Sequence, residues 1–470
     1  MLPIAVQNAT KTLRLTTRPR ASIDSVRALV LPPQVASRLG NHDSRNFSKT
    51  SRRWTHSAKW RPVQVLDEWV VKEARPISLR QLMVFGRSLT EARLISSANY
   101  VRTELPTRIA HRIRDMQRLP YVVVTNPHIS DVYELYYTAF DTFRRIKEIK
   151  TLEDNERLCK EIAKMLRAHL TVIPKLAMGI LECSGLMPAA ELDHFMNTIL
   201  RSRISRRVIA EQHLALTETY NSHWFSPGAK LSESEFIGEV FIKCVAKDVI
   251  EHCAKAVQEL ARSDNGPHAK IPKINVNGHL DASFPYILSH LEYIVGELLR
   301  NSVEAVIEKH QKSKNPTSVP PPIEVTVCEA QQHVIIRISD QGGGIPRDNL
   351  PYLWSFGKGP LKNQRLENLG QVPLMAATLQ ELKVNDGKLA VLQSNEHSNL
   401  HDSSLHSLST RPPNLRLGMG LPLSRVYAEY WAGSLELHSL EGYGVDAFLQ
   451  ISKLGNKNEQ LTTRAAMDAV

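Results

Sequence analysis

Apolar residues recur every three or four positions through most of the first half of the chain, from about residue 63 to residue 261. This spacing collects apolar side chains on one side of a helix, so it predicts a series of amphipathic helices. We predict helices at residues 78–99, 105–118, 132–148, 153–182, 186–204 and 234–260. Because several of these segments are long, the region is predicted to be a helical bundle rather than a compact α/β layer.

The pattern changes after a polar stretch at residues 262–270, which predicts a domain boundary. Beyond it, short alternating runs predict strands and longer periodic runs predict helices. The expected elements are a helix at 290–310, a hairpin of strands 323–328 and 333–339, a helix at 421–431, and strands 435–439 and 446–451. The predicted fold class is therefore a helical bundle at 63–261 followed by an α/β domain at 271–454. A long loop is expected at 360–413, and a tail at 455–470.

Composition supports a two-domain chain. Its 470 residues are 42% hydrophobic and 23% charged, enough to bury two ordinary cores. No apolar run approaches the roughly 20 residues that cross a bilayer, so we expect no transmembrane segment. The five cysteines are scattered without a CxxC pair, which argues against a zinc site or a disulfide framework.

The net charge of +11 is concentrated at the N-terminus. Residues 1–53 hold ten Lys and Arg against two acidic residues, so the other 417 residues carry only about +3. That remainder is too small to predict a nucleic-acid-binding surface. An Arg-rich, Ser/Thr-rich and acid-poor beginning is typical of a mitochondrial transit peptide, and residues 45–48 resemble a matrix-protease cleavage site. We therefore expect a protein of the mitochondrial matrix. The alternative is a disordered basic tail that binds an acidic partner.

The first candidate motif is ELLRNSVEA at residues 297–305. On a helix, Glu297, Asn301 and Glu304 fall on one face, while Val295 and Leu299 lie on the other side and can face a core. An Asn within a line of carboxylates offers a neutral oxygen, which suits a mostly hydrated Mg²⁺. The alternative is an ordinary exposed helix face.

The second motif, DQGGGIP at residues 340–346, directly follows a predicted strand. A carboxylate there, Asp340, can accept a hydrogen bond from an exocyclic amine such as that of adenine. Glycines such as Gly342 and Gly344 let the backbone approach a flat ring without an intervening Cβ. The alternative is a glycine turn with an Asp cap.

The third motif is a glycine pair that leads into a helix, where backbone N–H groups can face a phosphate chain. It comprises Arg416, Leu417, Gly418, Met419, Gly420 and Leu421. The three motifs in this order, with a glycine-containing turn at 441–444 behind them, resemble the nucleotide-binding domain of the GHKL group. That group includes histidine kinases, gyrase-type ATPases and chaperone ATPases. The resemblance implies an α/β sandwich for the second domain.

Further stretches in the first half narrow this resemblance. RTELPTRIAHRIRDMQRLP at 102–120, TNPH at 125–128, VYELY at 132–136 and SRISR at 202–206 are similar to signature stretches of the pyruvate and branched-chain 2-oxoacid dehydrogenase kinases. The similarity runs from about residue 79 to residue 451 and is broken mainly at 360–413. It implies an ATP-dependent protein-serine kinase of the mitochondrial matrix.

The resemblance also implies roles for individual residues. Glu297 matches the family's general base, Asn301 its Mg²⁺ ligand and Asp340 its adenine-binding residue. Arg300 is expected to offset charge on the transferred phosphoryl group. The remaining expected ATP contacts are Glu297 itself, Gly342, Gly344 and the loop Arg416, Leu417, Gly418, Met419, Gly420 and Leu421. ATP and Mg²⁺ are the implied cofactors, and the resemblance also admits K⁺.

Three single positions and one short stretch depart from the family pattern. Tyr293 stands where pyruvate-specific kinases have His, as in the branched-chain type, which leaves both substrates open. Glu304 stands where the family has Arg, and Val445 where it has Thr. Residues 354–358 replace a Ser/Thr-rich run.

The implied partners are a 2-oxoacid dehydrogenase complex, with its serine-bearing dehydrogenase subunit and lipoyl-bearing core, and a second copy of the chain. We expect pyruvate dehydrogenase as the target, with the branched-chain complex as the alternative. Two alternatives of another class are a sensor histidine kinase with phosphate on His111 and a GHKL ATP-driven binding module without kinase activity. A following Arg-Ile-Arg favours a structural or substrate-site role for His111.

Overall fold

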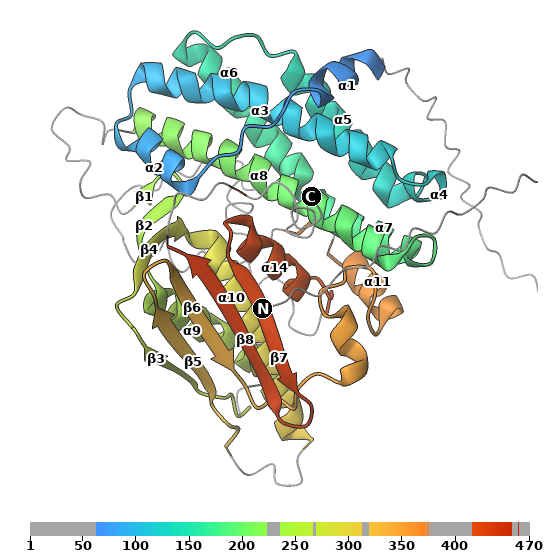
Figure 1. Ribbon diagram of the computed structural model, residues 1–470, viewed down its shortest axis with the longest axis vertical. Coiled ribbons are helices and arrows are strands. Elements are labelled where there is room, and N and C mark those ends of the chain that lie inside the picture. The colour runs from blue at the N-terminus through green and yellow to red at the C-terminus, as the bar shows by residue number, and fades with distance from the viewer. Residues whose placement is uncertain are drawn as a thin grey trace, which may run out of the picture. The chain divides into compact units, whose positions relative to one another are not determined.

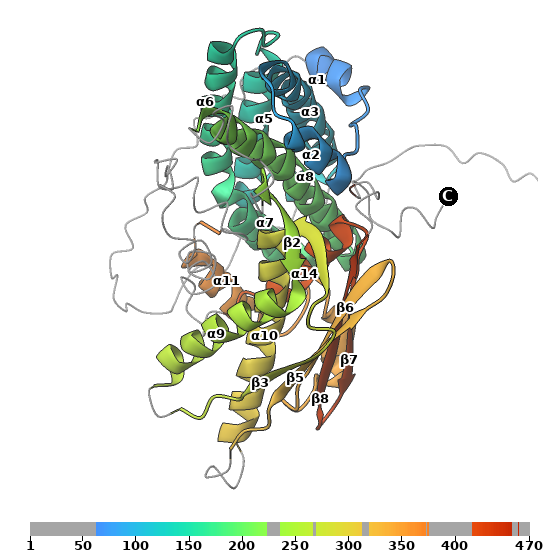
Figure 2. The same cartoon turned by 90° about the vertical axis from the view of Figure 1, so that its left-hand side faces the viewer.

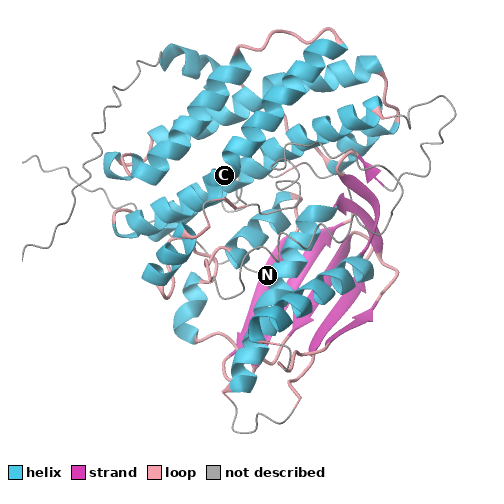
Figure 3. Cartoon of the chain, turned by 180° about the vertical axis from the view of Figure 1, so that it is seen from behind, coloured by secondary structure: helices cyan, strands magenta, loops and turns pink. Residues whose placement is uncertain are grey.

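The computed structural model describes residues 63–222, 236–266, 269–312, 319–372, 374–375, 416–453 and 459. In this part of the chain, helices fill the first region, and a mixed sheet with covering helices forms the second (Figures 1 and 3). This is the fold class predicted from the sequence. No helix within these ranges is long and apolar enough to cross a membrane. The predicted transit peptide at 1–53 lies outside the described residues.

The helical region is a bundle of long helices. Its members are α1 (Val63–Val70), α2 (Leu79–Arg87), α3 (Glu91–Gln117), α4 (Tyr121–Val124), α5 (Pro127–Arg144), α6 (Leu152–Ala168), α7 (Val172–Glu182) and α8 (Ala189–Asn221). Side-chain caps set several starts: Ser78 forms a capping box with Gln81, and Thr90 accepts the N–H of Arg93. Such caps satisfy backbone donors that a helix start leaves unpaired.

The predicted boundaries in this region were partly wrong. The predicted helix at 78–99 is two helices, because Thr90 caps a new helix after Ser88. That new helix, α3, then runs through Pro106, so the separate helix predicted to begin at residue 105 is wrong. The predicted 153–182 helix is interrupted by a 3₁₀ turn, His169–Thr171, and the predicted 186–204 helix extends to Asn221.

The second region is built on a five-stranded sheet in the order β3-β5-β6-β8-β7. Its strands are β3 (Ile274–Gly278), β5 (Ile323–Glu329), β6 (His333–Ser339), β7 (Ser434–Leu440) and β8 (Gly444–Ser452). Strand β3 pairs parallel to β5, and the other neighbours are antiparallel, including the predicted hairpin of β5 and β6. Figure 2 shows α9 (Ala246–Asn265) and α10 (Leu288–Gln311) on one side of this sheet.

One prediction failed at the junction of the two regions. The predicted helix at 234–260 is a pair of strands, β1 (Phe236–Ile237) and β2 (Val240–Val245), followed by α9. Both strands belong to a separate sheet with β4 (Ser283–Ile287), and α9 packs on α10. The boundary predicted after residue 261 therefore falls within the second region, and the bundle ends with α8.

The predicted long loop at 360–413 also needs correction at its start. Residues Lys362–Gly370 form a helix, α11, which packs against α7. Most of the remaining segment lies outside the described residues, as does the predicted tail 455–470 except for Glu459.

Buried charges join the two regions. Arg201 of α8, which is 1% exposed, donates to Glu429 of α14 (Gly420–Tyr430) over 2.8 Å. Arg108 of α3 pairs with the buried Glu459 over 2.7 Å, and Glu459 also bonds to the hydroxyl of Tyr430. The helix that follows the third motif is therefore tied to the bundle by ion pairs.

Candidate nucleotide-binding and catalytic site

Helix α10 of the second region contains the first motif. Val295 and Leu299 are fully buried, which confirms the prediction that this side of the helix faces a core. Glu297 is only 2% exposed, whereas Asn301 and Glu304 are half-buried. The face that was predicted to be functional therefore lies partly in the core and partly at the surface. Glu297, the proposed catalytic base, is on its buried part.

Arg300 connects the two carboxylates of this helix. Its Nη2 donates to Glu297 Oε2 over 2.7 Å, and its Nη1 lies 3.7 Å from Glu304 Oε1. Burial lowers the pKa of Arg300, but the charges of Glu297 and Glu304 outweigh it and leave the pKa above its ordinary value. Arg300 therefore stays cationic and holds Glu297 in a fixed orientation.

The glycine pair of the third motif lies directly against Glu297. A Cβ at Gly420 would overlap Glu297 Oε2, so a larger residue there would displace the Glu297 carboxylate. Gly418 has a φ of +66°, and α14 begins at Gly420 without a side-chain cap. Its first backbone N–H groups are therefore available to an anion, as expected for a phosphate-binding loop.

The other members of the third motif divide between core and surface. Leu417 and Met419 are buried, and Leu421 packs against the core. Arg416 is exposed, and its Nη2 donates to Glu308 of α10 over 2.9 Å. The apolar residues therefore hold the loop in the core, and the side chain of Arg416 contacts α10.

Asp340 lies where β6 ends, and it is 5% exposed. Its Oδ1 accepts the N–H of Gly342 over 2.8 Å, and its Oδ2 accepts the hydroxyl of Ser302 over 3.0 Å. Burial raises the pKa of Asp340 above its ordinary value, although the hydrogen bonds from Gly342 and Ser302 oppose the shift. Asp340 is therefore a desolvated acceptor held rigidly beside α10.

The glycines of the second motif allow three pieces of backbone to meet. A Cβ at Gly342 would lie 2.5 Å from the Cβ of Ala305, and one at Gly344 would overlap the carbonyl of Leu440. Gly342 and Gly344 thus let the turn pack on α10 and on the end of β7. The 441–444 turn joins them, since the N–H of Gly442 donates to the carbonyl of Gly343 over 2.7 Å.

Sequence reasoning missed several residues that hold these turns. Lys309 of α10 donates to the carbonyls of Gln341, Gly442 and Tyr443 over 2.9–3.2 Å. Its position seven residues after Ser302 was a usable signal, because about two turns of helix bring a side chain back to nearly the same face. Ser302 was hidden within the motif itself. Arg365 lies on α11, and no sequence pattern indicated its role, because the segment is predicted from sequence to be a loop.

A cavity of about 420 Å³ opens beside this motif cluster. It lies between α9, α10, α11 and Arg416, and its charged lining includes Arg300, Glu304 and Glu308. Glu304, where the resemblance leads one to expect Arg, therefore faces a space that also contains two arginines. Arg300 offsets its negative charge, and Arg416 pairs with Glu308.

Two of the other sequence candidates have structural contacts. His111 Nε2 lies 3.1 Å and 2.9 Å from the carbonyls of Val70 and Lys72, so the ring fastens the segment after α1. Tyr293 is buried, with its ring 5.2 Å from that of Tyr427 in α14. Both residues thus contribute to packing.

Within the described ranges there is no group of three or more His, Cys, Asp or Glu that could hold a metal ion by itself.

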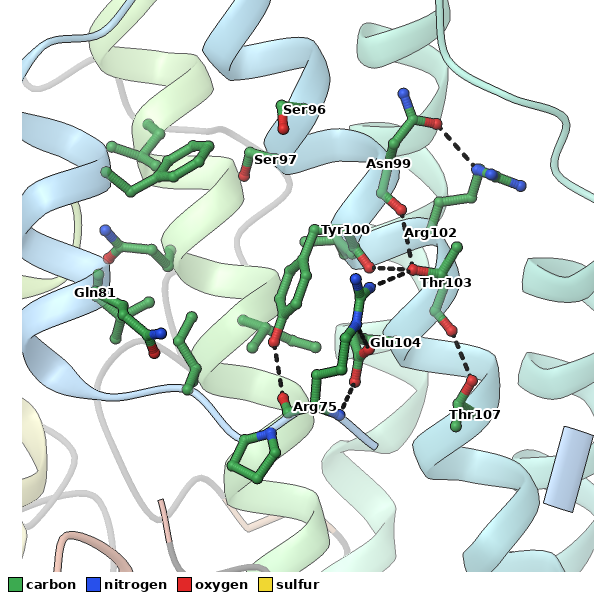
Figure 4. Close-up of a pocket in the computed structure, with 18 of the residues that line it drawn as sticks. Arg75, Gln81, Ser96, Ser97, Asn99, Tyr100, Arg102, Thr103, Glu104 and Thr107 are labelled. Carbon is green, nitrogen blue, oxygen red and sulfur yellow. Dashed lines mark hydrogen bonds and ion pairs between the residues drawn. The ribbon is translucent and has the colours of Figure 1, made fainter. Parts of the chain in front are cut away.

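A second, larger cavity of about 1280 Å³ lies in the helical region (Figure 4). Leu82 and Phe85 of α2 and Leu216 of α8 are among the residues that line it. On its polar side, Arg75 Nε donates to Glu104 over 2.6 Å, and the hydroxyl of Tyr100 donates to the Arg75 carbonyl over 3.1 Å. We refer to this cavity as the bundle groove.

The fold and the three clustered motifs define a protein with a GHKL-type nucleotide-binding domain behind a helical bundle. Comparison with known protein families gives the same classification. Residues 287–454 match the family of histidine kinase-, DNA gyrase B- and HSP90-like ATPases. Residues 76–241 match the family described as mitochondrial branched-chain alpha-ketoacid dehydrogenase kinase.

Individual relatives cover most of the chain. It is 34% identical to pyruvate dehydrogenase (acetyl-transferring) kinase 2, mitochondrial, of Saccharomyces cerevisiae, over 84% of this chain and 85% of the relative. The Arabidopsis thaliana pyruvate dehydrogenase kinase is 29% identical over 85% of this chain and 96% of the relative. Human isozyme 1 is 27% identical over 87% and 84%. The chain belongs to the family of mitochondrial 2-oxoacid dehydrogenase kinases that includes these proteins.

Proposed function

We propose that this chain is an ATP-dependent protein-serine kinase that phosphorylates and thereby inactivates the pyruvate dehydrogenase complex in the mitochondrial matrix. The observation that carries the proposal is the cluster of Glu297 and Arg300, in the middle of α10, with the Gly418–Gly420 loop. The names of the relatives support pyruvate dehydrogenase as the target. The branched-chain complex is the second candidate, because the matched model of the bundle carries that name.

The proposed chemistry is direct transfer of the ATP γ-phosphoryl group to a serine hydroxyl. Glu297 accepts the serine proton, and its buried contact with Arg300 keeps the carboxylate aimed at the glycine loop. Bound Mg²⁺, held by Asn301 and the phosphates, would neutralise charge on the transferred group. Arg300 adds positive charge on the same side, and backbone N–H groups at the start of α14 donate hydrogen bonds to the phosphate oxygens.

Asp340 is proposed to accept a hydrogen bond from the exocyclic amine of adenine. Its carboxylate is buried and held by Gly342 and Ser302, so it can accept one further donor without rearrangement. The adjacent Gly342 and Gly344 let the turn that carries Asp340 pack closely on α10 and on the end of β7, which holds the carboxylate in place.

The test is phosphoryl transfer with labelled ATP to purified pyruvate and branched-chain dehydrogenase complexes. Wild-type chain should label a serine of the pyruvate complex, and the phosphate should be acid-stable and alkali-labile. Glu297→Gln, which preserves side-chain shape, should lower transfer by roughly 100-fold or more while ATP still binds. Equal transfer by wild type and Glu297→Gln would contradict the mechanism. Acid-labile label on His111 would favour the histidine-kinase alternative.

We further propose that the bundle groove receives the lipoyl-bearing arm of the complex core. Its volume and its apolar lining suit a long, mainly aliphatic lysine conjugate. Val84 lines this groove and is 55% exposed. Val84→Asp should weaken binding of a lipoylated domain, whereas Val122→Asp, at a similarly exposed valine on α4, should not. Binding that is the same with and without the lipoyl group would refute this assignment.

We also propose that the chain forms a homodimer through its nucleotide-binding domains. The sheet face opposite α10 carries Ile335, Arg337 and Phe448, which are exposed or only half-buried. Light scattering that gives the mass of one chain would exclude the dimer.

A further inference from the structure

Helix α11 lies between the helical bundle and the glycine loop of the third motif. On the bundle side it packs on α7, and Lys362 Nζ donates to Ser184 Oγ over 2.8 Å. Just before it, the N–H of Phe356 donates to Asp193 of α8 over 2.8 Å. Both α11 and the segment that leads into it are therefore fastened to the bundle.

Arg365 extends from α11 to the other side and is 6% exposed. Its guanidinium donates to four backbone carbonyls: Phe356 over 2.9 Å, Lys358 over 3.2 Å, Leu417 over 3.2 Å and Gly418 over 3.3 Å. The first two carbonyls precede α11, and the last two belong to the glycine loop. A flat guanidinium with five N–H donors suits this pattern, which a lysine ammonium with three donors cannot reproduce.

These bonds fix which way the loop's N–H groups point. In a trans peptide the C=O and the N–H point in opposite directions. Since the carbonyls of Leu417 and Gly418 point at Arg365, the N–H groups of Gly418 and Met419 point away from it. Gly420, the next residue, lies against Glu297, so the loop contacts Arg365 at Gly418 and the proposed catalytic base at Gly420.

The local backbone conformation agrees with an anion site. Gly418 has a positive φ of +66°, and Met419 follows in the right-handed region at φ −107° and ψ −22°. Consecutive residues of opposite hand turn successive N–H groups toward a common concavity that binds anions. Asn368, one turn after Arg365 on α11, supports the same loop by donating to the carbonyl of Arg416 over 3.0 Å.

We infer that Arg365 is a positioning residue for the triphosphate: it binds the carbonyl side of the glycine loop and so presents the loop's N–H groups to the phosphates of ATP. Through Lys362 and Asp193, the bundle holds Arg365 and its neighbours in place. This inference rests on the proposed function, since it deepens the account of the same phosphate site.

The test compares the binding of ATP and adenosine by calorimetry. Arg365→Met keeps a long side chain but removes every donor, and should weaken ATP binding by roughly 10- to 100-fold. Adenosine, which lacks phosphates, should bind within about 2-fold of wild type, because Asp340 and its turn are unchanged. Arg365→Lys should fall between wild type and Arg365→Met. Glu367→Gln, at an exposed position on the same helix, is the matched control and should bind both ligands normally.

Two results would overturn the inference. One is unchanged ATP affinity in Arg365→Met. The other is an equal loss of ATP and adenosine, which would mean that Arg365 only stabilises the fold. If Arg365→Met does not fold, Asn368→Ala removes a single bond to the loop and must show the same preference for losing ATP.

The same titrations separate this inference from the proposed function. A wild-type chain that binds ATP but labels no dehydrogenase complex would refute the kinase, while the ATP and adenosine affinities of the variants would still decide the role of Arg365. A wild-type chain that binds no ATP would refute both.

Discussion

Gly342→Ala tests the contact between the second motif and α10. The added Cβ would lie 2.5 Å from the Cβ of Ala305, 3.0 Å from the Ala305 backbone carbon and 3.0 Å from Asp340 Oδ1. The turn must therefore move away from α10. That movement stretches the 2.8 Å hydrogen bond from the Gly342 N–H to Asp340.

The expected cost follows from these two effects. Overpacking by one methyl group costs about 1–3 kcal/mol. Loss of a hydrogen bond to a charged group costs about 1.5–3 kcal/mol when complete. Because the turn relaxes in part, we expect a loss of about 2–4 kcal/mol in the free energy of unfolding. ATP binding should weaken as well, since Asp340 is displaced.

A second substitution makes the prediction specific. Ala305→Gly removes the closest atom and by itself costs about 1 kcal/mol in helix propensity. Combined with Gly342→Ala, it should recover about 1–2 kcal/mol relative to the sum of the single effects. Recovery should be incomplete, because the Ala305 backbone carbon and Asp340 remain close.

Urea unfolding of the two single variants and the double variant measures this coupling. Gly185→Ala is the control, because a Cβ there meets nothing within 4 Å, and its effect should stay below about 1 kcal/mol. Strictly additive effects of Gly342→Ala and Ala305→Gly would refute the contact, as would a Gly342→Ala variant as stable as wild type.

Two further predictions concern buried carboxylates. Glu459→Gln removes the carboxylate charge that pairs with Arg108 over 2.7 Å and should lower the free energy of unfolding in urea by about 2–4 kcal/mol. The loss is smaller than for a buried arginine left without any partner, because Glu104 still contacts Arg108 over 3.2 Å. An unchanged unfolding midpoint would contradict this. Burial raises the pKa of Asp340 above its ordinary 3.8, so the folded state favours the protonated carboxyl. The free energy of unfolding should therefore fall as the pH rises from 3.8 to the raised pKa. Since the ionised form accepts the adenine amine, ATP affinity should fall as the pH drops through the raised pKa, and Asp340→Asn should abolish this dependence; a pH profile that is the same in both proteins would refute it.

The second region was largely predictable because its signals are local. Strands β5 and β6 alternate regularly, and glycine-containing turns follow β6 and β7. Helix α10 also followed from its apolar period, within two residues at its start and one at its end. Local pattern and tertiary structure agree at these positions, so the sequence was a reliable guide.

The failures share a physical cause, which is that tertiary contacts overrode local signals. Pro106 predicts a helix break, but it is buried within α3, where packing sustains the helix. Strands β1 and β2 were read as helix because short apolar runs fit either period, and only their pairing with β4 decides between them.

The site could be located from sequence more readily than its internal contacts. The motifs pointed to Glu297 and Asp340, and the structure places both beside the glycine turns. Nothing local could show that Arg300 binds Glu297 or that Arg416 lies against Glu308. Arg365 acts on carbonyls more than fifty residues away in the chain, so only the fold reveals it.

Calorimetric titration of the intact chain with Mg²⁺ and ATP tests whether one nucleotide binds between α10 and the glycine turns. We predict saturable binding of one ATP per chain, abolished by Asp340→Ala and retained by Glu297→Gln. If the wild-type chain takes up no ATP, or if Asp340→Ala binds it as tightly, the nucleotide does not lie in this site.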